Sequence, residues 1–366
     1  MRAAWVSGGL VVFFALMAGS PVVVKGDEAT PSVRALAAPA DLRPVRALQE
    51  SNGTVHLVAD SSHGPMYAQS TDYGKTFSKP QSLVDEASRQ PGLEFQVWDA
   101  TLGPDGRLFV ALGTNAWKLK LPKEQWGFHL AIRDPKSGVI APVRNINRKP
   151  SEGFSLAANE QGKVVACWLA DKLYANISLD GGKTFGDTVE IDPSFNPCNC
   201  CTTTCTFLPD GRVAILYREE TNNDRDMFVV YWDLEKRTAV KKPVSTTSWK
   251  IDACPMTYYS LARSGSGLLA AWPTRKSIFF ARLDEAGRLA KPGEVKTAGI
   301  SGMRTGLTTL ENRAGTMLLV WNEEGRVGWQ TFDRQGKAAD APATKSTRGK
   351  GVAAFIDASG GFIVLH

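Results

Sequence analysis

Two segments of this chain carry nearly the same turn sequence. Residues 70–77 read Ser-Thr-Asp-Tyr-Gly-Lys-Thr-Phe, and residues 178–185 read Ser-Leu-Asp-Gly-Gly-Lys-Thr-Phe. An Asp ahead of a Gly accepts hydrogen bonds from the backbone of a tight turn, and the Gly supplies the positive φ that such a turn requires. Thr and Phe then favour a new strand. The two copies predict an internal repeat of turns between strands.

A weaker form of the signal recurs along the chain. A second series of turns, marked by Gly, lies between the Asp turns, and a short strand follows each one. One repeat therefore reads as four antiparallel strands. We predict an all-β fold, a single β-propeller of six or seven four-stranded blades. The Asp turns are 46 to 62 residues apart and lie at Asp72, Asp134, Asp180, Asp233, Asp284 and Asp333.

The last repeat is incomplete. Six complete units precede residues 351–366, which have room for only two strands. A propeller has to close its ring, and the usual solution is that the N-terminal segment supplies a missing outer strand. We expect residues 32–39 to pair there. Counted literally, the repeats favour seven blades.

The first 26 residues differ in composition from the rest. They contain Arg2, an apolar run over residues 5–17 and no acidic residue. This pattern is typical of a secretory signal peptide, and it predicts a secreted or periplasmic propeller of residues 27–366. The alternative is an uncleaved anchor, because residues 5–24 are long enough to span a bilayer. Without residues 1–26 the formal charge falls from +6 to +4, too little to indicate a nucleic-acid or membrane-surface partner.

Four of the six cysteines fall within residues 198–205. An even number of cysteines in an exported chain predicts disulfides, and a bond from this group to Cys254 would join two neighbouring blades. The alternative is a thiolate site for Zn or Cu(I), the soft ions that cysteine prefers. Cys167 lies in an apolar strand and is expected to be a buried thiol. The candidates for either a disulfide or a metal are Cys198, Cys200, Cys201, Cys205 and Cys254.

Blade geometry sorts the loops onto two faces. The Gly and Asp turns fall on one face, so we expect any site on the other. Arg218 stands out on that face because the equivalent positions of the other repeats are uncharged, and its loop suits either an anion or sugar site or a self-paired solvated loop. The site face gathers residues 60–63, 117–129, 218–226, 274–276 and 322–326 within blades and residues 89–99, 144–152, 191–201, 250–259 and 299–306 between blades.

The pattern Ser-x-Asp-x-Gly-x-Thr-aromatic resembles the Asp box of the sialidase and neuraminidase superfamily, where the box is structural. The resemblance covers the chain from about residue 42 as a fold, and it is to a bacterial sialidase-like branch with a cysteine cluster. Sialidases hold the carboxylate of an acidic sugar with three arginines, and they use a Tyr nucleophile activated by a Glu, with an Asp as acid or base. The resemblance therefore implies exo-cleavage of a sialic-acid-like sugar.

The catalytic motifs of that family match only in part. Residues 258–261, Tyr-Tyr-Ser-Leu, resemble the segment around the family nucleophile, but the Arg-Ile-Pro motif is replaced by Leu-Arg-Pro-Val-Arg-Ala-Leu at residues 42–48. The resemblance implies Tyr259, or its neighbour Tyr258, as the nucleophile, Glu219 or Glu220 as the group that assists it, and Asp60 or Asp99 as the acid. It implies substrate-binding roles for Arg218, Arg304 and either Arg43 or Arg46, and structural roles for Asp72 and Asp180. Arg225, in the same loop as Arg218, is a further substrate-binding candidate.

The runner-up is a propeller that binds a glycan, another small acidic ligand or a metal without catalysis, since a fold does not determine a function. Sialidase-type chemistry requires no cofactor. His63 and His129 lie singly on the site face, and no Ser-His-Asp set or nucleic-acid motif accompanies them.

Overall fold

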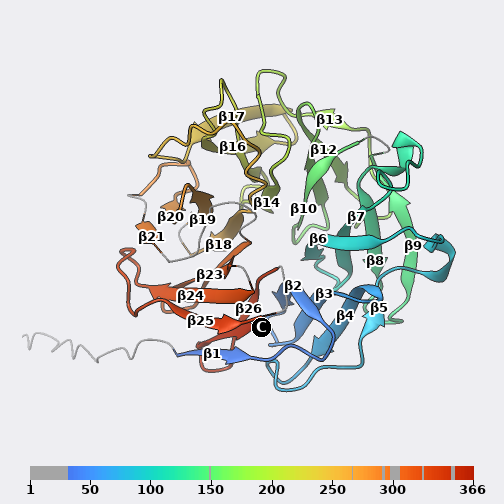
Figure 1. Ribbon diagram of the computed structural model, residues 1–366, viewed down its shortest axis with the longest axis horizontal. Helices are drawn as coiled ribbons and strands as arrows, with labels where there is room; N and C mark the ends of the chain where they lie inside the picture. Colours follow the sequence, from blue (N-terminus) through green and yellow to red (C-terminus); the bar gives the residue numbers. More distant parts are fainter. Residues whose placement is uncertain are drawn as a thin grey trace, which may run out of the picture. The chain divides into compact units, whose positions relative to one another are not determined.

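The strands form sheets that follow one another around a ring, as the blades of a propeller (Figure 1). The computed structural model describes residues 32–147, 150–265, 267–290, 293–296, 306–323, 325–347 and 351–366. These residues belong to the unit Pro31–His366. The expected signal segment, residues 1–26, and Arg304 lie outside the described residues. Within the described part, no helix has the length and apolar character needed to cross a membrane.

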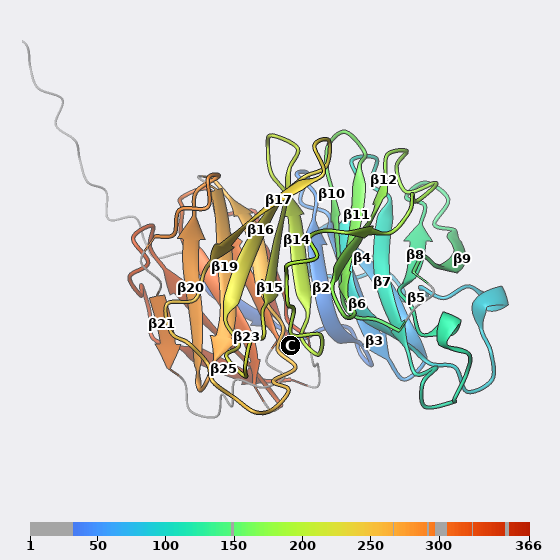
Figure 2. The ribbon, with the colours of Figure 1, turned by 90° about the horizontal axis from the view of Figure 1, so that it is seen from above.

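Six blades are four-stranded antiparallel sheets, and the seventh has three strands. Figure 2 shows the blades from the side, with their strands inclined to the ring axis. Blades 1 to 3 contain β2 (Arg43–Gln49), β3 (Val55–Ser61), β4 (Gly64–Ser70), β5 (Gln81–Ser82); β6 (Phe95–Leu102), β7 (Leu108–Thr114), β8 (His129–Arg133), β9 (Ile140–Asn145); and β10 (Glu152–Ala158), β11 (Val164–Leu169), β12 (Leu173–Ser178), β13 (Val189–Glu190). Blades 4 to 6 contain β14 (Thr203–Phe207), β15 (Val213–Arg218), β16 (Met227–Asp233), β17 (Thr238–Pro243); β18 (Ser260–Ser264), β19 (Gly267–Thr274), β20 (Ser277–Leu283), β21 (Gly293–Lys296); and β22 (Leu307–Glu311), β23 (Met317–Glu323), β24 (Arg326–Phe332), β25 (Ala343–Ser346). Blade 7 contains β26 (Ala353–Ile356), β27 (Phe362–Leu365) and β1 (Val33–Leu36), and the two short 3-10 helices are η1 (Glu86–Ser88) and η2 (Lys123–Gln125).

The N-terminal strand closes the ring. β1 pairs in parallel with β27, from Val33 opposite Phe362 to Leu36 opposite Leu365, and Figure 1 shows β1 in blue beside the red C-terminal strands. The backbone N–H of Phe362 donates to the Ser32 carbonyl at 2.9 Å. This confirms the expected closure by residues 32–39 and decides the blade count in favour of seven.

The two Asp-box segments form the same turn between the third and fourth strands of blades 1 and 3. Ser70 Oγ donates to Asp72 Oδ1 at 2.7 Å, and the Thr76 backbone N–H donates to the same oxygen at 2.9 Å. In blade 3 the Thr184 backbone N–H donates to Asp180 Oδ1, also at 2.9 Å. The hydrogen bonds from Thr76 lower the pKa of Asp72 to about 2. Each Asp thus holds its turn as a charged acceptor.

The Gly at the fifth position of each box, Gly74 or Gly182, also packs against the preceding blade. A Cβ built on Gly182 would lie 2.2 Å from a Phe109 ring carbon, and one on Gly74 would lie 2.4 Å from the Phe355 ring. Both glycines have positive φ, 79° and 76°. Only a residue without a side chain lets the turn and the neighbouring aromatic ring meet, so the box joins blades as well as strands.

Replacing Gly182 by Ala should lower the free energy of unfolding by about 2 kcal/mol or more, because the methyl group overlaps the Phe109 ring and the backbone has positive φ. Gly181→Ala is a matched control. Gly181 also has positive φ, 73°, but its Cβ would meet only the end of the Arg107 side chain, at 3.4 Å. Urea denaturation of both variants separates the two contributions; equal losses would show that the contact between blades contributes nothing.

Aromatic side chains near the ends of the second strands fill the space between blades. Trp168, Tyr217, Trp272 and Trp321 are each at most 1% exposed and belong to different apolar clusters. Neighbouring blades therefore cover both faces of each of these second strands. The repeated aromatic positions in the sequence mark this packing.

Candidate functional site

A pocket of about 1090 Å³ lies between blades 2 and 3, slightly larger than the usual small-molecule site of about 300–1,000 Å³. Its walls come from the ends of β7 and β11, the loops that follow them, and the links that enter blades 3 to 5. Parts of residues 89–99, 117–129, 144–152, 191–201 and 250–259 of the predicted site face line it, together with residues 168–171 and Tyr174, which were not predicted. The aromatic side chains that line the pocket are Trp98, Trp117, Trp126, Phe154, Trp168, Tyr174 and Tyr258.

Several of these side chains are open to solvent. Trp117 is 58% exposed, Tyr258 is 40% exposed and Met256 is 39% exposed, and all three line the pocket. The Trp126 indole N–H donates to the Leu121 carbonyl at 2.9 Å, which fixes that ring at the pocket wall. Large apolar side chains that gather at a hollow, rather than singly on the surface, indicate a binding site.

Bulges in three consecutive inner strands shape the wall nearest the ring axis. The register shifts between Pro44 and Arg46 in β2, between Val97 and Asp99 in β6, and between Glu152 and Ser155 in β10. A bulge turns the intervening side chains in a new direction and is common beside functional sites. Three of the intervening residues, Val45, Trp98 and Phe154, line a second, axial pocket of about 140 Å³.

The axial pocket brings together several of the residues that the family resemblance implied. It adjoins the larger pocket, because Gln96, Trp98, Phe154 and Tyr258 line both. Its volume is below the usual range for a ligand site, so by itself it does not enclose a sugar. The implied residues that line it are Arg46, Asp60, Asp99, Tyr258 and Tyr259.

The acidic groups of the axial pocket join neighbouring blades. Asp99, 3% exposed, accepts a hydrogen bond from Arg46 Nε at 2.7 Å and another from the Leu156 backbone N–H at 2.9 Å. Asp60 Oδ1 accepts from the Val97 backbone N–H at 3.0 Å. Both carboxylates thus hold the inner strand of the next blade in place, and Arg46 is engaged by Asp99.

Arg218 is completely buried and does not line either pocket. Its guanidinium group donates to the Tyr259 hydroxyl at 3.2 Å and to the carbonyls of Arg225 and Pro273. The group also lies 5.0 Å from the centre of the Trp249 ring and 5.6 Å from that of Tyr259. The guanidinium of Arg218, which the resemblance assigns to a substrate carboxylate, therefore donates its hydrogen bonds to protein groups instead.

Tyr259 and Glu219 do not meet. Burial and the negative charge of Cys201 raise the pKa of Tyr259, the opposite of what activates a nucleophile. The Glu219 carboxylate accepts from the Tyr217 hydroxyl at 2.9 Å and from Lys241. The acid that the resemblance pairs with the tyrosine is therefore engaged elsewhere in blade 4.

The other implied polar residues also have protein partners. Arg43 donates to the Ser61 carbonyl at 3.0 Å, and Glu220 accepts from the Asn223 backbone N–H at 2.9 Å. Arg225 donates to the Ile251 carbonyl at 3.2 Å and to Cys198 Sγ at 2.8 Å. Among the described arginines, the structure gathers Arg218 and Arg225 around the cysteines rather than around an open pocket.

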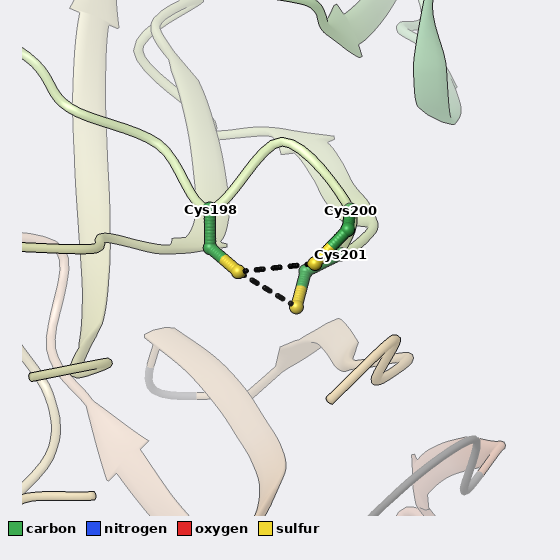
Figure 3. A group of neighbouring side chains, drawn as sticks. All are labelled: Cys198, Cys200 and Cys201. Carbon is green, nitrogen blue, oxygen red and sulfur yellow. Dashed lines mark hydrogen bonds between the residues drawn. The ribbon is translucent and has the colours of Figure 1, made fainter. Parts of the chain in front are cut away.

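Three cysteines, Cys198, Cys200 and Cys201, form a compact group at the entrance to blade 4 (Figure 3). Cys198 Sγ lies 3.3 Å from Cys201 Sγ and 3.5 Å from Cys200 Sγ. Cys200 is bonded to Cys254, with a Cα–Cα distance of 6.1 Å. This disulfide joins the links that enter blades 4 and 5, which is the first of the two alternatives predicted for the cysteines. Cys205 lies apart from this group.

Cys205 packs with Cys167 between blades 3 and 4, whereas Cys201 packs between blades 4 and 5. A separation of four residues predicts one shared side for Cys201 and Cys205 if both belong to one strand, and this prediction is wrong. Cys201 precedes β14, which begins at Thr203, so the strand alternation does not extend to it. The Cys205 thiol instead accepts a hydrogen bond from Ser155 Oγ at 3.4 Å.

Positive charge and hydrogen bonding favour a thiolate in the group. The pKa of Cys201 is lowered to about 5, first by the hydrogen bond from Cys198 and then by the charge of Arg218. The pKa of Cys198 is raised, because its proton is shared with Cys201 and the thiol is buried. These directions favour Cys198 as the donor and Cys201 as the acceptor of the hydrogen bond between them.

Two carboxylates of the large pocket had no assigned role in the sequence. Glu152 begins β10, where it is exposed at the pocket wall; its pKa is raised, first by partial desolvation among the surrounding protein atoms and then by the negative charge of Cys201. Asp171 follows β11 and accepts a hydrogen bond from the Tyr174 hydroxyl at 2.9 Å. Glu152 lies in the predicted site-face link of residues 144–152, whereas Asp171 lies outside the segments predicted for that face. The lining residues include no Lys or Arg.

No protein-family model matches the sequence, and no curated protein matches it. Among solved structures, an α-L-arabinanase of Penicillium chrysogenum complexed with arabinobiose is similar, with a TM-score of 0.50 and 15% identity over 82% of this chain and 95% of that chain. The SapL1 lectin in complex with α-methyl fucoside has a TM-score of 0.51 and 11% identity over 84% of this chain and 96% of that chain. A quinonprotein alcohol dehydrogenase-like protein of Bacteroides thetaiotaomicron has a TM-score of 0.50 and 12% identity over 86% of this chain and 68% of that chain. Identities this low show the fold alone, and the chain is a seven-bladed β-propeller.

Proposed function

We propose that this chain binds a glycan in the aromatic pocket between blades 2 and 3. The observation that carries the proposal is the convergence of Trp98, Trp117, Trp126 and Tyr258 on one hollow of about 1090 Å³. Aromatic rings offer flat apolar faces for the C–H faces of sugar rings, and the polar tips of Trp and Tyr can bond hydroxyl groups. Two of the similar structures hold sugars, arabinobiose and α-methyl fucoside, which supports a glycan as the ligand class.

The charges of the pocket favour a neutral glycan over an acidic one. Glu152 and Asp171 are the charged residues of its wall, and they repel a sugar carboxylate. Sialidase-type binding calls instead for arginines around one tyrosine hydroxyl. Arg218 is buried against Tyr259, and Arg46 is paired with Asp99. Action on a sialic-acid-like sugar is accordingly the weaker form of the proposal.

Binding can be tested on a panel of immobilised neutral and sialylated glycans. We expect a neutral glycan to bind, and Trp117→Ala to weaken that binding about tenfold, the loss of one well-placed aromatic contact of about 1.4 kcal/mol. Leu179→Ala is the matched control, because Leu179 is 72% exposed but lies in the Asp-box turn of blade 3. Equal binding by the two variants would contradict the proposal. Selective binding of sialylated glycans, lost on Arg46→Ala, would restore the sialidase-like form.

A second candidate is hydrolysis of the bound glycan. It is favoured by the raised pKa of Glu152, because a glycosidase acid has to stay protonated toward neutral pH, and by a second carboxylate, Asp171, in the same pocket. In this reaction the acid passes its proton to the leaving glycosidic oxygen while a water molecule adds to the anomeric carbon. Binding without release of sugar would leave the chain a glycan-binding propeller.

A further inference from the structure

Four sulfur atoms meet beside the aromatic pocket. The Sγ atoms of Cys198, Cys200 and Cys201 lie within 4.8 Å of one another, and Cys254 adds a fourth because it is bonded to Cys200. Around a tetrahedral Zn²⁺ ion with Zn–S bonds of about 2.3 Å, sulfur atoms are about 3.8 Å apart. The distances from Cys198 Sγ, 3.3 Å and 3.5 Å, are close to this value. The backbone therefore already gathers a four-sulfur set.

Two arginines face this group without a carboxylate partner. Arg225 Nη1 lies 2.8 Å from Cys198 Sγ, and the acceptors of the buried Arg218 are a hydroxyl and two carbonyls. Among the residues that the structure describes, neither guanidinium group forms an ion pair with Asp or Glu. A buried cation of this kind needs a negative charge nearby. A Zn²⁺ ion with four thiolates carries two net negative charges, which the two arginines would neutralise.

We propose that the reduced chain binds one Zn²⁺ ion through Cys198, Cys200, Cys201 and Cys254. The Cys200–Cys254 disulfide is the oxidised state of the same group. A dithiol reductant breaks its S–S bond by supplying two electrons and two protons, and is itself oxidised to a disulfide. Zn²⁺ then displaces the thiol protons to solvent. Cys254 is exposed, so the ion has a path to the site.

Neighbouring polar groups suit the outer shell of such a site. Thr257 Oγ1 lies 3.5 Å from Cys201 Sγ and donates to the Tyr259 hydroxyl at 2.7 Å. Arg218 donates to the same hydroxyl. Groups that hold and polarise the ligands in this way set the affinity of metal sites. The site would also fix the segment from Cys254 to Tyr258, which forms part of the pocket wall.

The test uses the full chain, reduced with a dithiol and freed of oxygen, and titrated with Zn²⁺ or Co²⁺ alone. We expect one equivalent of Zn²⁺ to bind, and Co²⁺ to give sulfur-to-metal charge-transfer absorption with the intense visible bands of a tetrahedral ion. Cys254→Ser should weaken Zn²⁺ binding at least about tenfold. Because Cys254 is exposed, this variant should keep the fold. Cys167→Ser, at a buried thiol outside the group, should bind as the unaltered chain does.

Arg225→Gln provides a second variant that keeps all four sulfurs. It should lower the Zn²⁺ affinity about 10- to 100-fold, as the loss of an outer-shell partner does. The proposal is overturned if the reduced chain binds no Zn²⁺, if Co²⁺ shows no sulfur charge transfer, or if Cys254→Ser binds as tightly as the unaltered chain. These readouts require no glycan, so they are independent of the proposed function.

Discussion

Replacing Arg218 by Ala should lower the free energy of unfolding by about 3–5 kcal/mol, among the largest losses expected from one substitution in this chain. The change empties a site in which the side chain is 0% exposed. It leaves the carbonyls of Arg225 and Pro273 without their donor. It also removes the cation that stabilises the Cys201 thiolate. Urea denaturation of the oxidised chain at neutral pH measures the loss.

Two further variants show whether the buried position causes this loss. Arg288→Ala removes an arginine whose side chain is 84% exposed and pairs with Asp284, so a change of about 0–1 kcal/mol is expected. Arg218→Lys keeps the charge but not the planar set of N–H donors, so its loss of unfolding free energy should lie between those of Arg218→Ala and Arg288→Ala. If Arg218→Ala lowered the free energy of unfolding no more than Arg288→Ala, the buried contacts of Arg218 would not stabilise the fold.

Much of the fold follows from local turn chemistry, and the sequence predicts that part well. In the fourth repeat the turn series predicts strands at residues 201–208 and 227–233, and the structure has β14 at Thr203–Phe207 and β16 at Met227–Asp233. A Gly or Asp turn acts within a few residues, so its signal survives in any context. The ring closure was also predictable, because a two-strand last unit leaves an edge that another segment has to cover.

The site was harder to predict because it depends on contacts between blades. Arg218 was correctly singled out as an unusual charge, but in a propeller both faces of an inner strand are covered, so alternation does not tell a core side chain from a site side chain. The pocket depends on bulges near Arg46, Asp99 and Ser155. Gly153, with a positive φ of 70°, lies in the bulge of β10, and Pro44 precedes that of β2, but no such residue marks the bulge of β6. Glu152 was placed on the predicted site face without a role, because its raised pKa arises from desolvation and from Cys201, 49 positions along the chain.

If the chain hydrolyses the glycan that it binds, Glu152→Gln should lower kcat about 10²- to 10⁴-fold, the usual contribution of a positioned acid. Gln has nearly the same shape and bonds sugar hydroxyls but has no proton to give to the leaving oxygen, so the Kd for the glycan should hardly change. The acid acts in its protonated form. Desolvation and the charge of Cys201 raise its pKa, so the activity of the unaltered chain should persist above the usual carboxyl range and fall as the pH rises through that raised pKa.

Release of reducing sugar, measured beside glycan affinity, distinguishes this role from a structural one. Glu190→Gln is the matched control, because Glu190 lies exposed at the end of β13 and does not line the pocket. Asp171→Asn should also lower kcat, since the attacking water needs a base and Asp171 is the other carboxylate of the wall. A Glu152→Gln variant that releases sugar at the rate of Glu190→Gln would remove Glu152 from the reaction. Unchanged glycan affinity in that variant would still leave the aromatic pocket as the binding site, because the stacking surfaces of Trp98, Trp117 and Trp126 do not depend on the proton that Glu152 holds.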